Sequence, residues 1–250
     1  MSFRRAWFVA AAPFLAACTE ISSNKNELLS VQFDALASPS VVVGDSLRDT
    51  TGLLALPHVA AFNFQGDTID LPTIRYHALD RGVTVDSVSG LIIGDSLRAT
   101  AVRIIASVGL VQAQQLLALS LRPDTILAGT ARDTIILTAL DTTKNVSKLV
   151  GVKLVHRAAT DSPVPSYIVS FQIVSPSNPA FADLINEGGT LSHVDTTDSG
   201  GLAGRQIRLH TGKLNLTATD SIVVNATAKY RGVKVKGSPV RLVVVFKPGS

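Results

Sequence analysis

The chain contains a single cysteine, Cys18, among its 250 residues. With no second thiol, the chain cannot form an internal disulfide, and no site of several thiolates can hold a metal. Burial of apolar side chains must therefore stabilise the fold. About 230 residues follow Cys18, which is more than one small β-sandwich needs and suits two domains of ordinary size.

The N-terminus has the pattern of a secretory signal. A basic start, residues 1–5, precedes an apolar run over residues 6–17 that only Pro13 interrupts. A charged beginning, a short apolar core and small residues before the cleavage point characterise such signals. The run is shorter than the roughly 20 residues of a transmembrane helix. We therefore expect a signal peptide over residues 1–17.

The end of this segment, Leu15-Ala16-Ala17-Cys18, resembles the lipobox of bacterial lipoproteins. The resemblance implies that Cys18 is acylated, becomes the first mature residue and attaches the protein to a membrane. The alternative is an ordinary signal peptide cut nearby, which leaves Cys18 as an exposed, reactive thiol. In that family an Asp directly after the cysteine favours inner-membrane retention. Thr19 and Glu20 follow here, which implies the outer membrane as the destination, facing the periplasm or the surface, in a host that has one.

Charge and aromatic residues are both scarce. Removal of Arg4 and Arg5 with the signal leaves 21 of the 23 basic residues against 19 acidic ones, a formal charge of +2. Aromatic residues make up 5% of the chain. A nucleic-acid surface needs a basic patch, and stacking on bases needs aromatic rings. We therefore expect no nucleic-acid partner.

Residues 18–28 are polar and without periodicity, so we expect a lipidated N-terminus and tether there. Beyond them, short runs of Val, Ile, Leu and Thr alternate with Gly, Pro, Asp and Ser, which predicts strands. In residues 205–209 and 232–237, apolar and polar residues alternate as in antiparallel strands with one solvated face. The predicted strands are residues 30–34, 59–64, 73–77, 99–106, 134–139, 152–156, 167–174, 206–210, 214–218, 221–228, 233–236 and 240–246.

Helical periods are few. Residues 108–119 are the best candidate, but the β-branched runs beside them favour two strands around a turn. Residues 181–186 have the length of one helical turn before Gly188-Gly189. Many short strands with frequent turn signals predict an all-β fold of β-sandwiches.

A domain boundary is expected near residues 120–124, where Pro123 interrupts ladder pairing. It separates a first domain over residues 29–121 from a second over residues 122–248, arranged end to end. A weak repeat also occurs, since Val43-Gly44-Asp45-Ser46-Leu47-Arg48 recurs as Ile93-Gly94-Asp95-Ser96-Leu97-Arg98. The shared element predicts a Gly-Asp turn that feeds a strand, because Gly permits unusual backbone angles and Asp bonds its own backbone.

The motifs of the second domain resemble the invasin/intimin type of bacterial Ig-like domain. They are Ser162-Pro163-Val164-Pro165, the run over 167–174, Gly188-Gly189-Thr190-Leu191-Ser192, the turn at 195–203 and the closing run at 243–246. The first domain resembles a bacterial Ig-like domain more loosely, through residues 84–106, and residues 53–57 have no counterpart. The resemblance implies two tandem immunoglobulin-like β-sandwiches that serve as surface-attached spacers or binding units.

One motif suggests an enzyme. Gly44-Asp45-Ser46-Leu47, extended by Asp49 and Gly52, spells the nucleophile block of the GDSL hydrolases. Those enzymes take a base from an Asp-x-x-His block, and none of the five histidines has Asp three places before it. A serine without an orienting base is a poor nucleophile. The tetrapeptide also occurs twice, which a repeated turn explains, so Ser46 is not expected to be catalytic.

Metal and phosphate sites are not expected either. The histidines form no i, i+4 pair and no His-x-His, as a zinc site on one element would require. Residues 195–201 offer carboxylates for calcium but lack EF-hand spacing. The alternative there is a turn whose aspartates accept backbone N–H groups. No glycine-rich loop leads into a helix to hold phosphate, so no cofactor is expected.

These observations predict a non-enzymatic, lipid-anchored cell-envelope protein that acts as an Ig-like structural or adhesive module. An accessory module that binds polysaccharide or another envelope protein is the alternative, and a GDSL-type hydrolase is the weaker one.

Overall fold

The computed structural model describes residues 27–70, 73–137, 145–158, 160–176, 178, 181–210, 212 and 219–249. All the elements of regular structure in these ranges are β-strands. No helix within them has the length and hydropathy that a membrane span requires. The expected signal peptide, Cys18 and the strand predicted at 214–218 lie outside the described residues.

The N-terminal half, residues 27–120, is built on a four-stranded sheet in the order β2-β9-β8-β5. In this sheet β2 runs parallel to β9, whereas the other neighbours are antiparallel. Two smaller sheets, β1-β3-β4 and β6-β7, complete the half. Its strands are β1 (Ser30–Phe33), β2 (Ser40–Val42), β3 (Val59–Phe62), β4 (Thr68–Ile69), β5 (Arg75–Ala78), β6 (Val83–Val85), β7 (Ile92–Gly94), β8 (Val102–Val108) and β9 (Val111–Ser120).

The C-terminal half, residues 121–249, has two larger sheets. One has the order β10-β12-β17-β15 with β13 paired to β12, and the other has the order β11-β21-β18-β14-β16. A short hairpin, β19-β20, stands apart from both. The strands are β10 (Thr125–Ala128), β11 (Arg132–Leu137), β12 (Val150–Arg157), β13 (Asp161–Pro163), β14 (Ile168–Ser175), β15 (Ala182–Ile185), β16 (Val194–Thr196), β17 (Leu202–Leu209), β18 (Asp220–Thr227), β19 (Lys229–Tyr230), β20 (Val233–Lys234) and β21 (Val240–Pro248).

The strand order of the C-terminal half is that of an immunoglobulin sandwich. When β10, β12, β14, β15, β17, β18 and β21 are lettered A to G in chain order, the sheets read A-B-E-D and G-F-C, which is the immunoglobulin arrangement. The first strand continues as β11, which pairs in parallel with β21. The N-terminal half repeats this parallel pairing between β2 and β9, but its second layer is divided into two small sheets.

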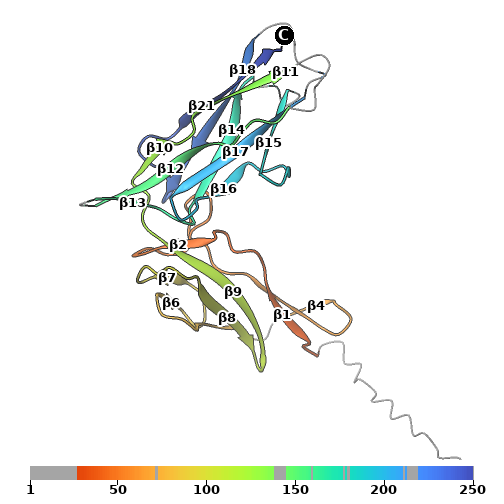
Figure 1. Cartoon of the computed structure of the whole chain (residues 1–250). Coiled ribbons are helices and arrows are strands. Elements are labelled where there is room, and N and C mark those ends of the chain that lie inside the picture. Colours follow the sequence, from red (N-terminus) through yellow and green to blue (C-terminus); the bar gives the residue numbers. More distant parts are fainter. Residues whose placement is uncertain are drawn as a thin grey trace, which may run out of the picture.

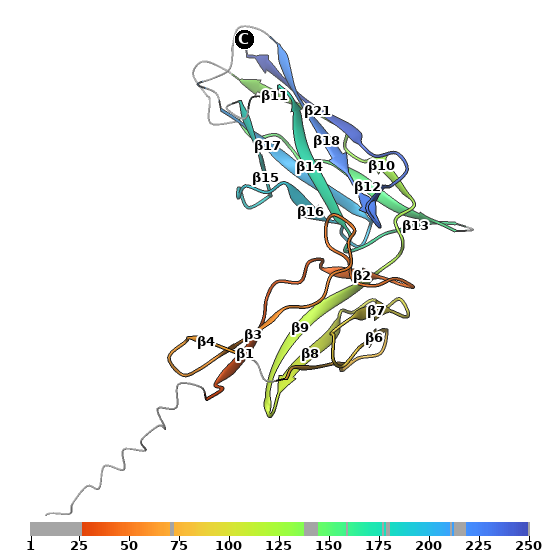
Figure 2. The same cartoon turned by 180° about the vertical axis from the view of Figure 1, so that it is seen from behind.

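The buried apolar residues fall into clusters that do not mix the two halves. One cluster extends from Ile126 to Phe246, and the other two lie between Val31 and Leu119. No ladder among the described strands joins the halves. Both views show the halves end to end, connected where β9 leads into β10 (Figures 1 and 2). The largest fully buried side chains include Leu154, Leu242 and Leu117, each worth roughly 1.5–3 kcal/mol on burial.

Of two ambiguous stretches, one differs from its helical interpretation and the other matches its prediction. The helical turn predicted at 181–186 is the strand β15, which pairs with β17 from Ala182–Leu209 to Ile185–Gln206. A pairing partner distant in sequence therefore overrides the local preference. The two strands around a turn predicted for residues 108–119 are confirmed, because β8 ends at Val108, the turn is Gly109-Leu110 and β9 begins at Val111. The glutamines at 112 and 114 lie on its exposed face, so this stretch does not need a helix to solvate them.

In the two alternating stretches, residues 205–209 and 232–237, the burial of the side chains follows the predicted pattern only in part. Val235 is buried, but Val233 is 70% exposed, because β20 belongs to a hairpin that projects from the sandwich rather than to a sheet with a covered face. In β17, Ile207 and Leu209 lie inward as expected, and Arg205 lies inward with them.

Candidate functional site: the joint between the halves

The hairpin β19-β20 reaches from the C-terminal half to the N-terminal half. Its strands pair Lys229 with Lys234 and Tyr230 with Val233, which leaves a two-residue tip. Arg231 has a φ of 50° and Gly232 one of 78°, as a type I′ turn requires at both central positions. A non-glycine residue in this region is uncommon. The turn therefore holds Arg231 at the most advanced point of the hairpin.

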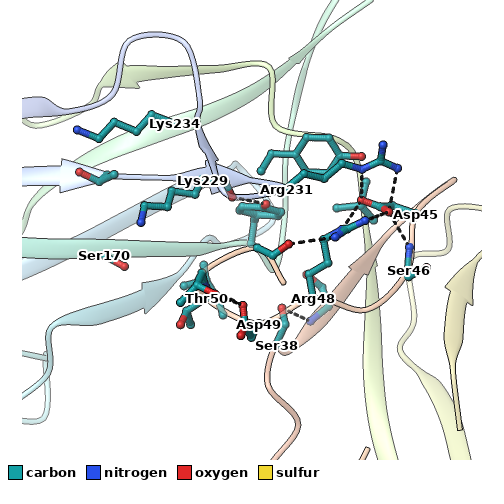
Figure 3. A pocket seen from close by; sticks show the side chains of 18 of the residues that line it. Ser38, Asp45, Ser46, Arg48, Asp49, Thr50, Ser170, Lys229, Arg231 and Lys234 are labelled. Atoms are coloured by element: carbon teal, nitrogen blue, oxygen red, sulfur yellow. Dashed lines mark hydrogen bonds and ion pairs between the residues drawn. The ribbon is translucent and has the colours of Figure 1, made fainter. Parts of the chain in front are cut away.

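Arg231 bonds to a buried carboxylate of the other half. Its Nε and Nη2 donate to Oδ2 and Oδ1 of Asp45, both at 2.9 Å. Arg48 donates to the same oxygens from Nε at 2.9 Å and from Nη2 at 3.0 Å, and the Ser46 N–H adds a bond of 2.9 Å. Asp45 is only 4% exposed, and Figure 3 shows the two guanidinium groups meeting at it. We call Asp45, Arg48 and Arg231 the Asp45 cluster.

The cluster keeps Asp45 ionised. Burial acts to raise the pKa of the Asp45 carboxyl, but the hydrogen bonds from Arg231, Arg48 and the Ser46 N–H outweigh it and hold the pKa well below its usual range. Two bidentate guanidinium partners account for this direction, because such bonds are the strong ones. Arg231 also lies over the Tyr230 ring, 5.4 Å from its centroid.

Two buried hydroxyls add further bonds across the joint. Ser40 Oγ, in β2, donates to the Ser166 carbonyl at 2.5 Å, and Ser120 Oγ, at the end of β9, donates to the Pro165 carbonyl at 2.7 Å. Both serines are buried, and Ser120 Oγ also lies 3.3 Å from the Leu121 carbonyl, so both hydroxyls keep hydrogen-bond acceptors although they are removed from water. The loop before β14 is therefore seated on the parallel pair β2-β9.

The backbones of the two halves touch at Gly52. A Cβ atom added there would lie 1.9 Å from the Gly232 nitrogen at the hairpin tip, and Gly52 has a φ of 91°. Asp49 shapes this loop, because its Oδ1 accepts bonds from the N–H groups of Thr51 at 2.8 Å and Leu53 at 2.9 Å. Only glycine permits so close an approach.

A cleft of about 460 Å³ opens beside this contact. One wall is the loop over residues 45–52 of the N-terminal half. The other is formed by β14, β18 and the β19-β20 hairpin of the C-terminal half (Figure 3). The joint thus combines a charged cluster, two hydroxyl bonds, a backbone contact and an adjacent polar cleft.

The GDSL-like motif supplies this joint. Gly44 makes a turn with a φ of 78°, Asp45 is the centre of the cluster, and Leu47 is fully buried in the core. Ser46 contributes its backbone N–H to Asp45. The motif residues therefore have structural roles at the joint, and no sequence pattern indicated the contact with the other half.

The two copies of the repeat lie side by side. The Gly44 N–H donates to the Gly94 carbonyl at 2.7 Å, and the Gly94 N–H donates to the Asp45 carbonyl at 3.0 Å. The predicted Gly-Asp turn is confirmed for the first copy, where Asp45 accepts from the next backbone N–H. It is wrong for the second, because Gly94 ends β7 and a Cβ there would lie 2.7 Å from the Val42 carbonyl oxygen.

The histidines lie in separate places. His58 pairs with Asp34 at 2.5 Å, His156 with Asp124 at 2.7 Å and His210 with Asp183 at 2.9 Å. These contacts join residues far apart in sequence, so local spacing could not reveal them. Within the described ranges, no three or more His, Cys, Asp or Glu side chains form a group that could hold a metal.

The acidic turn at 195–201 matches the backbone-turn alternative. Asp198 Oδ1 accepts bonds from the N–H groups of Gly200 at 2.8 Å and Leu202 at 2.9 Å. Asp195 accepts the Gly204 N–H at 2.7 Å. The interpretation as a turn stabilised by its own aspartates is confirmed.

A buried arginine, Arg205, lies next to this turn, and no sequence motif marked it as a candidate site residue. Arg205 is 6% exposed and pairs with Asp195 at 2.9 Å. It also bonds to the carbonyls of Ser192, Gly204 and Val194. Full pairing of its donors makes the burial of this charge tolerable. Only its inward position on β17, next to Ile207, could have drawn attention to it.

Comparison with known proteins gives remote structural likenesses only. No family model and no curated protein matches the chain. Domains 5–6 of the S-layer protein SbsC share 12% identity at a TM-score of 0.30, covering 90% of this chain and 99% of that one. Human protocadherin-24 EC1-2 shares 14% at 0.28, covering 90% and 99%. The adhesin InvE of Yersinia pseudotuberculosis shares 12% at 0.29, covering 89% and 61%. At such scores the strand order, rather than these likenesses, identifies the sandwich.

Proposed function

We propose that this chain is a non-enzymatic, lipid-anchored protein of the cell envelope, built from two tandem Ig-like domains that act as a structural or adhesive module. The domains span residues 29–121 and 122–248, and a short tether follows the lipid on Cys18. The outer membrane is the proposed location. The module holds a binding surface at a set distance and direction from the membrane.

The joint between the halves is the observation that carries this proposal. A spacer or presenting module needs a constant angle between its domains, and interfaces within a chain otherwise allow relative motion. Several contacts join the two halves at this joint. They are the buried Asp45 carboxylate with its two arginines, the hydrogen bonds of two buried serines and the backbone contact at Gly52. These contacts oppose hinge motion, which is what a spacer requires and a closing enzyme cleft does not.

The lipid anchor is tested by Cys18→Ser in the native host. We expect most of the variant to move from the membrane fraction to the soluble fraction, because each buried CH₂ of an acyl chain contributes about 0.8 kcal/mol to membrane binding. Mass spectrometry of the wild-type mature N-terminus should show an acylated Cys18. The variant Ser22→Ala, which leaves the lipobox intact, is the control. Retention of Cys18→Ser in the membrane fraction would remove the anchor from the proposal.

The hydrolase alternative is tested by Ser46→Ala. We expect the wild-type protein and the variant to show the same background rate on short-chain p-nitrophenyl esters, because Ser46 contributes a backbone N–H to the joint and Asp45 is engaged by arginines. An ester-hydrolysing activity that disappears in Ser46→Ala while the thermal unfolding curve stays unchanged would overturn the non-enzymatic assignment.

A further inference from the structure

The cleft beside the joint has a wall of paired, uncharged polar side chains. On the outer face of β14 and β18, Ser170 lies opposite Thr227 and Gln172 lies opposite Asn225. All four line the cleft, whereas their neighbours on the strands, such as Phe171, face the core. Hydroxyl and amide groups both donate and accept hydrogen bonds. This wall is therefore suited to a ligand that carries many hydroxyl groups.

Two lysines stand directly opposite each other at the edge of this wall. Lys229 and Lys234 form a cross-strand pair in the hairpin β19-β20, and both line the cleft. Figure 3 shows their side chains extending in the same direction, away from Asp45. Like charges directly opposite on neighbouring strands destabilise the pairing. In the part of the chain that the structure describes, neither ammonium group has a carboxylate partner.

The charge of the cleft lining is positive after internal pairing. The cationic side chains are Arg48, Lys229, Arg231 and Lys234, and the carboxylates are Asp45 and Asp49, which leaves a formal +2. Asp45 already binds both arginines, and Asp49 accepts bonds from its own loop. The two lysines are therefore the cations that remain available to an incoming anion.

We propose that the cleft binds a segment of an anionic polysaccharide. A carboxylate or phosphate group of the chain binds between Lys229 and Lys234, and sugar hydroxyls bond to the Ser170–Thr227 and Gln172–Asn225 pairs. The volume of about 460 Å³ lies within the range of roughly 300–1,000 Å³ for small-ligand clefts. This inference rests on the proposed function, because it assigns a ligand class to the surface that the fixed joint presents.

The test is isothermal titration calorimetry of the full chain, purified in detergent, with defined polymers. Polygalacturonate supplies carboxylates, poly(glycerol phosphate) supplies phosphates, and dextran is neutral. We expect at least one polyanion to bind and dextran not to bind. In the double variant Lys229→Gln/Lys234→Gln, Kd for that polyanion should rise about tenfold or more, because two charge-assisted contacts are lost. The polymer that binds identifies carboxylate or phosphate as the recognised group.

The matched control is Lys153→Gln/Lys247→Gln, which removes the same charge from two exposed positions that do not line the cleft. Its Kd should stay within about twofold of wild type, since rim charges remote from a site act weakly. Thermal unfolding without ligand gives a second readout. The cleft variant should unfold at the wild-type temperature or slightly above it, because a like-charge pair has been removed.

Three results would overturn the inference. One is that wild-type protein binds neither polyanion, another is that the control weakens binding as much as the cleft variant, and the third is that dextran binds equally well. Each of these leaves the Cys18 fractionation result and the rigidity of the joint unaffected. The ligand assignment and the spacer proposal therefore fail independently.

Discussion

Asparagine in place of Asp45 should uncouple the two halves and lower the free energy of unfolding by about 3 kcal/mol, in the range for loss of one partner of a buried ion pair. The side chain keeps its shape, but the charge that holds Arg48 and Arg231 together is lost. The two guanidinium groups then face each other without an anion. Differential scanning calorimetry should show one transition in the wild type and two separated transitions in the variant.

The repeat provides a matched control for this substitution. Asp95 occupies the position of Asp45 in the second copy, is exposed, and accepts a bond from Thr84 Oγ1 at 2.8 Å. We expect Asp95→Asn to cost less than about 1 kcal/mol, as for an exposed hydrogen bond. Equal effects of the two substitutions would show that Asp45 does not couple the halves.

The same cluster sets an expected dependence on pH. The pKa of Asp45 is lower in the folded protein than its ordinary value of about 3.9. A carboxyl with a depressed folded pKa contributes stability above the unfolded pKa and loses it as the pH falls through the folded value. The difference between wild type and Asp45→Asn should therefore be constant from neutral pH to about pH 5 and shrink below about pH 4. Urea unfolding at a series of pH values measures it.

Gly52→Ala should force the halves apart. The new Cβ would lie 1.9 Å from the Gly232 nitrogen, and backbone atoms cannot yield as a side chain can. The hairpin tip must retreat, which also lengthens the bonds between Arg231 and Asp45. We expect a loss of about 1–3 kcal/mol from the positive φ and a further loss of about 2 kcal/mol or more from the displaced ion pair.

Gly66→Ala separates these two contributions. Gly66 has a φ of 84°, and a Cβ there meets no other atom within 4 Å, so this substitution carries the backbone strain alone. Small-angle X-ray scattering should show a changed maximum dimension for Gly52→Ala and an unchanged one for Gly66→Ala. If the scattering profiles and unfolding free energies of the two variants coincide, the contact at Gly52 does not set the angle between the halves.

Most strands could be predicted from the sequence because their signal is local. The predicted runs at 30–34, 59–64, 167–174 and 221–228 correspond to β1, β3, β14 and β18 within a few residues. In each, apolar side chains recur with the period of a strand. The exception is 181–186, a stretch whose local pattern fits either a helical turn or a strand, and pairing with β17 decides for the strand.

The candidate site was not predictable in the same way. Asp45 and Ser46 stood out as part of a nucleophile block, and the structure assigns them to the joint because Arg231, 186 positions away, meets Asp45. The same limit applies to Ser40 and Ser120, whose acceptors lie 126 and 45 positions away. Such partners cannot be found from their spacing in the sequence, because the docking of the two halves sets the distance between them in space.

The sequence by itself determined an all-β chain with a lone cysteine, turn-forming glycines and alternating strands. These features are local, because the side-chain alternation of a strand and the residue types of a turn are set within a few neighbouring residues. Only the tertiary structure decided which polar residues are buried, which lysines face each other and what the GDSL-like motif is for. The physical reason is that burial and ion pairing depend on surfaces brought together from distant parts of the chain. The local sequence of Asp45 indicates a turn or a nucleophile block, and its role at the joint exists only because the hairpin tip of the other half reaches it.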